Sequence, residues 1–208
     1  MKFLIPRGGV IHPEFAGCLT TYKHRGIPSH ITKRGGYWAG DNCAFKDFSA
    51  DKFTTWIERM TPYRGTCLFI ACPDVVADHG ATLARWYEWR DRLSFWPLAF
   101  VGQDGCAPDQ IPDDCAAVFI GGSTAWKMSQ TAVDCIEWGI ENGKHIHIGR
   151  VNYWKRYEHF RSIPGSDAFT CDGTRIAFQA NNAIKDWRKY QNAAYNLRFD
   201  LSFRDSCG

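Results

Sequence analysis

The feature that most constrains the fold is a series of short apolar runs, each of which stops abruptly at a polar or glycine-rich turn. Two of these runs, residues 98–101 and 118–120, are rich in β-branched and aromatic side chains. Runs of this length and content are typical of buried strands. Equivalent runs predict further strands at residues 3–6, 36–40, 66–71, 145–148 and 167–171.

Segments with apolar residues at helical spacing separate most of these strands. They predict helices at residues 48–60, 77–93, 129–142, 153–160 and 176–196. Residues 7–35 show neither strand nor helix periodicity and are predicted to be irregular, with a basic surface loop at residues 22–34. Regular alternation of strand and helix is typical of parallel strands joined by right-handed crossovers.

The strand count and the chain length together indicate the architecture. About seven predicted strands lie between an open doubly wound sheet and a closed (β/α)8 barrel. The chain has 208 residues, close to the lower limit of about 200 for such a barrel. No Gly-x-Gly-x-x-Gly fingerprint and no phosphate-binding loop follows a strand. We therefore predict an α/β fold, a compact, trimmed (β/α)8 TIM-like barrel that forms a single domain over residues 1–208.

The composition limits where the protein works and what it binds. A net charge of +3 permits a polyanionic partner without requiring one. Nine cysteines, an odd number with no Cys-x-x-Cys pair, indicate free thiols in a reducing compartment. The N-terminal apolar run is too short for a signal peptide, and no stretch approaches a membrane span. We expect a cytoplasmic protein that does not associate with membranes.

Acidic, amide and glycine residues recur where the predicted strands end. Because the carboxyl ends of parallel strands meet at one mouth of a barrel, we expect these residues to converge there. The ordinary alternative is a set of unremarkable strand-to-helix turns. The residues at these ends are Asp41, Asn42, Asp74, Gln103, Gly121, Gly122, Arg150, Asn152 and Asp172.

This set of groups suits a guanine-like base better than a carbohydrate or a metal ion. The N–H groups of guanine require carboxylate acceptors, and its O6 requires donors such as Gln103 and the Gly122 N–H. A further carboxylate facing the sugar can attack C1′ and form a covalent glycosyl intermediate. A metal site would need closely spaced ligands, which are absent from the sequence. We interpret His145 and His147 as the polar face of a strand, and we expect neither a metal nor another cofactor.

A segment that interleaves aromatic and cationic residues follows the strand predicted at residues 145–148. If the target base lies in a duplex it must be flipped out, and cations near the mouth would hold the phosphates. We predict Arg150, Asn152, Lys155 and Arg156 as nucleic-acid contacts. A solvated helix face explains the same residues equally well.

Six motifs along residues 36–174 resemble those of the tRNA-guanine transglycosylase superfamily. The resemblance is closest to its small phage-encoded members, the deazapurine DNA-modification (DpdA-like) transglycosylases. It implies a (β/α)8 barrel that exchanges guanine for a 7-deazaguanine, in the host cytoplasm if the chain is phage-encoded. The motifs are GYWAGDNCAF, CPDVVAD, LAFVGQDG, FIGGSTAWK, IHIGRVNYWKR and DAFTCDGT.

The resemblance also implies a role for individual residues. Asp41 matches the general acid/base, with Asn42 beside it in the base site. Asp74 matches the carboxylate that contacts the N1/N2 edge of the base, and Asp172 matches the nucleophile. The family's contacts to O6 fall on Gln103, Gly121 and Gly122.

Three departures from the family pattern affect these assignments. The spacing before Asp172 is longer than the family motif, so Asp167 is the alternative nucleophile or else a buried structural carboxylate. The cysteine cluster that holds zinc in the tRNA enzymes is missing, so we expect no metal. The chain is also much shorter than the tRNA enzymes, which favours DNA over tRNA as the acceptor.

We predict a DNA-guanine transglycosylase that exchanges guanine for a 7-deazaguanine, such as 7-cyano-7-deazaguanine, through a covalent aspartyl-glycosyl intermediate. Three alternatives use the same site differently. They are a tRNA-guanine transglycosylase, an N-glycosidase or nucleoside hydrolase with water as the acceptor, and a non-catalytic nucleotide-binding module.

Overall fold

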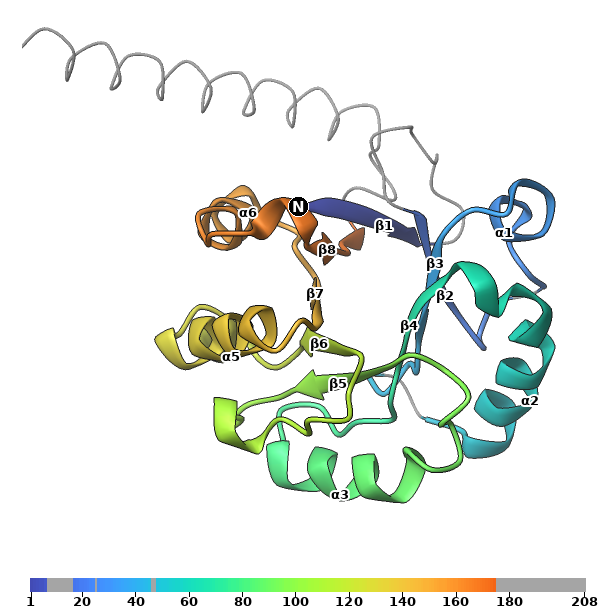
Figure 1. Cartoon of the computed structure of the whole chain (residues 1–208), viewed down its shortest axis with the longest axis horizontal. Coiled ribbons are helices and arrows are strands. Elements are labelled where there is room, and N and C mark those ends of the chain that lie inside the picture. The colour runs from blue at the N-terminus through green and yellow to red at the C-terminus, as the bar shows by residue number, and fades with distance from the viewer. Residues whose placement is uncertain (7–16, 25, 46–47, 175–208) are drawn as a thin grey trace, which may run out of the picture.

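The structure is a closed barrel of eight parallel strands in sequence order (Figure 1). It is a computed structural model that describes residues 1–6, 17–24, 26–45 and 48–174. The barrel closes where the last strand pairs with the first, with Lys2 opposite Thr170. This confirms the predicted (β/α)8 TIM-like fold. The strands are β1 Lys2–Pro6, β2 Gly17–Thr21, β3 Trp38–Asp41, β4 Cys67–Ala71, β5 Leu98–Gly102, β6 Ala117–Ile120, β7 His145–Ile148 and β8 Thr170–Cys171.

The prediction that residues 7–35 are irregular is wrong for two segments. Strand β2 and helix α1, Ser29–Arg34, both lie within it. The sequence GCLTT of β2 has little hydrophobic signal of its own, and its parallel pairing with β1 and β3 defines it as a strand. Gly17 is needed there because a Cβ would lie 2.1 Å from the Tyr37 carbonyl oxygen.

The helices cover the outside of the strands. In α2 the predicted apolar face is buried, and the helix begins directly after Ser49. In α3, Trp86 and Trp89 are buried whereas Tyr87 is exposed. The helix predicted at residues 176–196 lies outside the described residues. The remaining bounds are α2 Ala50–Met60, α3 His79–Trp89, α4 Thr124–Lys127, α5 Gln130–Glu141 and α6 Trp154–Arg161, with short 3-10 helices η1 Thr61–Thr66, η2 Pro108–Gln110 and η3 Ser166–Ala168.

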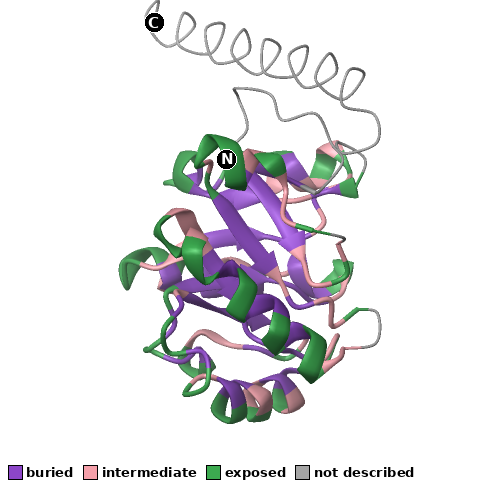
Figure 2. Cartoon of the chain, turned by 90° about the vertical axis from the view of Figure 1, so that its right-hand side faces the viewer, coloured by how far each residue is buried: buried purple, intermediate pink, exposed green. Residues whose placement is uncertain are grey.

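Two apolar layers form the core, and Figure 2 shows the buried strands at the centre of the molecule. The larger layer packs between the strands and the helices. The smaller layer fills the barrel interior with side chains from β1 to β6, and four of these are alanines, which keeps the interior narrow. Its members are Leu4, Leu19, Ala39, Phe69, Ala71, Ala99, Val101, Ala117 and Phe119.

Strands β7 and β8 give the barrel interior a polar side. Ile146 and Ile148 belong to the outer layer, so His145 and His147, which alternate with them, face inward. Both imidazole rings contact Phe69, and both form hydrogen bonds to Thr170. The interior is therefore apolar along six strands and polar along the last two.

Candidate active site

A pocket opens where the carboxyl ends of the strands meet. Seven of the predicted residues line it, together with the exposed ring of Phe45 and the buried ring of Phe119. The structure thus brings together residues that are up to 131 positions apart in the sequence, as expected for strand ends in a barrel. The predicted residues in the lining are Asp41, Asn42, Asp74, Gln103, Gly121, Arg150 and Asp172.

Two side-chain amides hold Asp74 on one side of the pocket. Asn42 Nδ2 donates to Asp74 Oδ1 at 2.7 Å, and Gln103 Nε2 donates to Asp74 Oδ2 at 2.5 Å. Burial raises the pKa of the Asp74 carboxyl, and the two amide donors oppose that rise. Each carboxylate oxygen keeps a lone pair, so Asp74 can still accept hydrogen bonds from a ligand.

The backbone fixes which way the Gln103 amide points. Its Oε1 accepts from the N–H groups of Ala77 and Gly122, both at 2.9 Å. The Nε2 group therefore faces Asp74 and keeps one N–H for a ligand. The Gly122 N–H, which we expected to contact a base, instead orients Gln103. Gly121 lines the pocket, and a Cβ there would lie 2.9 Å from Gln103 Nε2.

Asp41, the last residue of β3, has an environment unlike that of Asp74. Burial, together with the neighbouring Asp172 and Asp74 carboxylates, raises its pKa to about 6, although a backbone hydrogen bond opposes the rise. That bond comes from the Cys43 N–H, which donates to Oδ1 at 2.7 Å. A carboxyl with a pKa near 6 can gain and lose a proton close to neutral pH, which suits a general acid/base.

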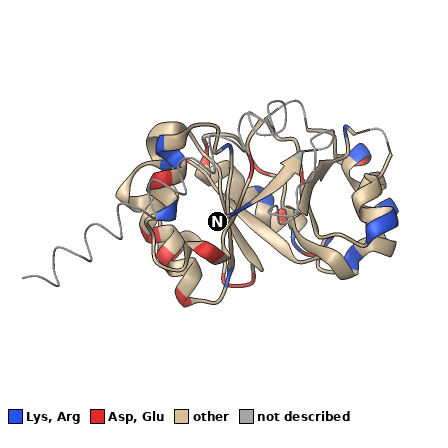
Figure 3. Ribbon diagram, turned by 90° about the horizontal axis from the view of Figure 1, so that it is seen from above, with Lys and Arg blue, Asp and Glu red and all other residues tan. Residues whose placement is uncertain are grey.

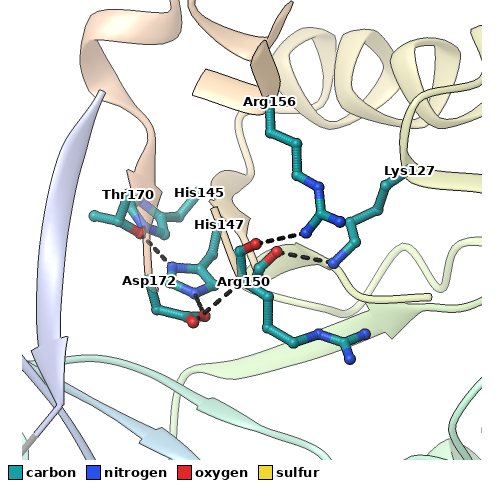
Figure 4. A network of polar contacts seen from close by, with 8 residues as sticks. Lys127, His145, His147, Arg150, Arg156, Thr170 and Asp172 are labelled. Carbon is teal, nitrogen blue, oxygen red and sulfur yellow. Dashed lines mark hydrogen bonds and ion pairs between the residues drawn. The ribbon is translucent and has the colours of Figure 1, made fainter. Parts of the chain in front are cut away.

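Asp172 follows β8 on the opposite side of the pocket, with 13% of its side chain exposed. His147 Nε2 lies 3.1 Å from Asp172 Oδ2, and the Arg150 N–H donates to Oδ1 at 3.1 Å (Figure 4). Among the described residues each oxygen therefore has one partner, and it can still face a substrate.

Asp167, the alternative nucleophile, is far from the pocket. It lies in η3 rather than in the predicted strand, and its side chain is 98% exposed. Its carboxylate lies 3.8 Å from the N-terminal amino group, which marks the amino end of β1 and hence the opposite mouth of the barrel. The described geometry supports neither a catalytic nor a buried structural role for Asp167.

The loop after β7 is held by the side chains of Lys127 and Arg156. Lys127 Nζ donates to the Gly149 carbonyl oxygen at 2.9 Å, and Arg156 donates to the Arg150 carbonyl oxygen at 2.9 Å. Between them Arg150 has a φ of 58°, a left-handed conformation that is costly for a residue with a side chain. Lys127 is 1% exposed, and burial, with Arg150 nearby, lowers its pKa to about 7.

The residues predicted to contact nucleic acid differ in whether their side chains already form hydrogen bonds within the protein. Arg150 donates to the Gly122 carbonyl oxygen at 2.7 Å, and its guanidinium lies 4.9 Å from the centre of the Phe45 ring. Arg156 also donates to Thr124 Oγ1, so both of its contacts are internal. Asn152 accepts a hydrogen bond from Thr174, and Lys155 is exposed on α6. Figure 3 shows Lys and Arg of the described residues on both sides of the barrel.

Three residues of this region were not predicted from the sequence as functional. Phe45 follows Asp41 and Asn42 within one loop, so its place beside two strand-end polar residues was the signal available. Lys127 precedes the helix predicted at residues 129–142, and nothing in the sequence pattern marked it as buried. His147 looked like any polar residue in a strand.

Within the described residues, no group of His, Cys, Asp and Glu side chains is arranged to hold a metal ion. No helix in that part of the chain has the length and apolar content needed to cross a membrane. Comparisons with protein-family models, curated proteins and solved structures found no match.

Proposed function

We propose that this protein is a DNA-guanine transglycosylase that exchanges guanine for a 7-deazaguanine through a covalent bond to Asp172. The observation that carries the proposal is the convergence of three carboxylates with three different environments in one pocket. Asp74 is fixed by amide donors, Asp41 has a pKa of about 6, and Asp172 is held by His147 and a backbone N–H. Environments that separate carboxylates in this way support separate roles.

The amide-bound carboxylate recognises the base. Asp74 accepts the N1–H and N2–H of guanine with the lone pairs that Asn42 and Gln103 leave available. The remaining N–H of Gln103 donates to O6. A 7-deazaguanine presents the same edge, so one site accepts both the leaving and the incoming base.

The other two carboxyl groups carry the reaction in two steps. In the first, an Asp172 oxygen bonds to C1′, the bond from C1′ to N9 breaks with its electron pair on the base, and Asp41 gives the base a proton. In the second, N9 of the 7-deazaguanine loses its proton to Asp41 and attacks C1′, and the electron pair of the broken C1′–O bond returns to Asp172. Both steps use the same acid/base, as required for a retaining exchange.

The mouth of the pocket supports a nucleic-acid substrate. Phe45 is 66% exposed there beside the Arg150 guanidinium, an arrangement suited to a flipped base and its phosphate. Tyr153, directly before α6, is 62% exposed.

Nucleoside mass spectrometry tests the proposal directly. The purified protein is incubated with guanine-containing DNA, or with tRNA, and isotopically labelled 7-cyano-7-deazaguanine. We expect label in DNA, and none with Asp172→Ala. Label in tRNA alone would support the tRNA enzyme, and release of free guanine without incorporation would support a hydrolase. Binding without either product would overturn the enzymatic proposal.

A further inference from the structure

His147 lies inside the barrel and forms hydrogen bonds through both ring nitrogens. It is 0% exposed, and its ring contacts those of Phe119 and Phe69 at centroid distances of 4.5 and 5.0 Å. Its Nε2 lies 3.1 Å from Asp172 Oδ2 and its Nδ1 lies 2.9 Å from Thr170 Oγ1. His145 continues the chain, because its Nε2 lies 2.7 Å from the same hydroxyl oxygen.

The sheet itself builds this hydrogen-bonded chain. His147 is paired with Thr170 in the parallel register of β7 and β8. His145 and His147 are two residues apart, and so are Thr170 and Asp172, so each pair projects on the same face of its strand. Positions set by paired strands are more rigid than positions set by loops, because the backbone hydrogen bonds hold them.

One direction of donation satisfies every group in the chain. His145 Nε2–H donates to the Thr170 oxygen, the Thr170 hydroxyl donates to His147 Nδ1, and His147 Nε2–H donates to Asp172. Burial lowers the pKa of His145 to about 4, so His145 is neutral at neutral pH. In this arrangement the N–H proton of His147 lies on Nε2, the ring nitrogen that faces the Asp172 carboxylate.

Burying these polar side chains inside the barrel costs free energy, and packing alone does not explain why they are there. The surrounding layer is apolar, and an aromatic or aliphatic side chain would fill the space beside Phe69 and Phe119 without needing partners. Because His147 is fully buried and directed at Asp172, it does not reach a substrate. Its polar contacts end at the carboxylate that lines the pocket.

We propose that His147 is a positioning residue for Asp172, with Thr170 and His145 fixing its tautomer. His147 holds Oδ2 from inside the barrel, while the Arg150 N–H holds Oδ1 from the loop above. The carboxylate cannot rotate without losing one donor, so its remaining lone pairs stay directed into the pocket. This inference rests on the proposed function in one respect, that Asp172 is the nucleophile.

Kinetic measurements test the inference with three variants. His147→Phe removes the donor while filling the space, and we expect kcat for base exchange to fall about 10- to 100-fold, with KM for the base changed less than about threefold. His147→Gln keeps an N–H that can face Asp172, and we expect it to recover part of that loss. Ile146→Val, a buried change on the outward face of the same strand, should leave kcat unchanged. A folded His147→Phe variant with wild-type kcat would overturn the proposal.

Nitrogen-15 NMR of histidine-labelled protein supplies a readout that is independent of activity, and the tautomer is measured on the wild type. We expect His147 to carry its proton on Nε2, with Nδ1 unprotonated, and Thr170→Val to shift the Nδ1 resonance specifically. A proton on Nδ1 alone would overturn the proposal. If the wild type exchanges no base, the proposed function fails, and the measured tautomer still decides whether the hydrogen-bonded chain exists.

Discussion

The two sides of the pocket hold their carboxylates in different ways. Asp74 sits above the apolar part of the barrel, and the amides that bind it come from neighbouring strand ends. Asp172 lies above the polar part of the barrel, and its partners are His147 inside the barrel and the Arg150 N–H. The loop that carries this N–H is held by hydrogen bonds from two side chains, those of Lys127 and Arg156. The arrangement at Asp74 suits recognition of the uncharged N–H edge of a base. The arrangement at Asp172 suits a carboxylate that must form and break a bond to a substrate.

The largest effect expected from this comparison is at Asp172. Asp172→Asn keeps the shape and the acceptor for the Arg150 N–H but removes the nucleophile. We expect the exchange rate to fall by at least about 10³-fold, while the Kd for 7-deazaguanine, measured by calorimetry, stays within about threefold. Asp167→Asn is the matched control, since it makes the same change at an exposed carboxylate. Equal losses in the two variants would show that the effect of Asp172→Asn is not specific to the pocket, and would contradict its role as the nucleophile.

A second large effect is expected at Asp41, where activity and stability move in opposite directions. Asp41→Asn keeps the oxygen that accepts the Cys43 N–H but cannot exchange a proton, so we expect a rate loss of about 10²- to 10⁴-fold. The wild-type pKa is raised from 3.8 to about 6. Between these values the folded state binds more protons than the unfolded state, so the free energy of unfolding falls as pH rises.

The stability of Asp41→Asn therefore depends on pH in a defined way. Above pH 6 the variant avoids a cost of at most about 3 kcal/mol, and it should unfold at a higher denaturant concentration than the wild type. Below about pH 3 the advantage should disappear, because Asp41 is then protonated in both states. Chemical denaturation at about pH 3 and pH 8 measures both limits, and an advantage of equal size at both would contradict the assigned cause.

A smaller effect, confined to binding, is expected at Asp74. Asp74→Asn turns an amide NH2 group towards Asn42, Gln103 or the base, which leaves donors facing donors. We expect KM for the incoming base to rise about 10- to 100-fold, corresponding to the 1–3 kcal/mol of an unsatisfied buried group. Asp109→Asn, at an exposed position, is the control. A change in kcat without a change in KM would show that Asp74 acts in the chemical step rather than in binding the base.

The contrast between the two sides also explains what the sequence could predict. Asp41, Asp74, Gln103 and Asp172 each follow an apolar run, and parallel strands necessarily bring such ends together. Strand positions were predictable for the same reason. Strand β2 was not, because its pairing partners define it rather than its own hydrophobicity.

The polar contacts that support the site could not be predicted from the sequence pattern. His147 has the same periodicity whether it faces water or a carboxylate, and only the pairing of β7 with β8 distinguishes the two. The burial of Lys127 depends on the Gly149 carbonyl, 22 positions away. Likewise, the Gly122 N–H was expected to face a base, and its partner Gln103 is set by the tertiary fold.

The smallest expected effects separate two adjacent cations at the rim, Lys155 and Arg156. Lys155 is exposed, whereas Arg156 donates to the Arg150 carbonyl and to Thr124. We expect Lys155→Ala to raise KM for DNA about two- to fivefold and to reduce the salt dependence of binding by about one phosphate contact. We expect Arg156→Ala to leave that salt dependence unchanged and to lower the free energy of unfolding by about 1–2 kcal/mol.

Fluorescence anisotropy of labelled DNA over a salt series, paired with chemical denaturation, measures both quantities on each variant. If Arg156→Ala lowers the salt dependence while stability is unchanged, Arg156 contacts phosphate, and the clamp on the Arg150 loop is not its role. If neither variant alters DNA binding, the solvated-face interpretation of α6 holds. Among the described residues, Arg150, beside the exposed ring of Phe45 at the pocket mouth, would then be the next candidate for a phosphate contact.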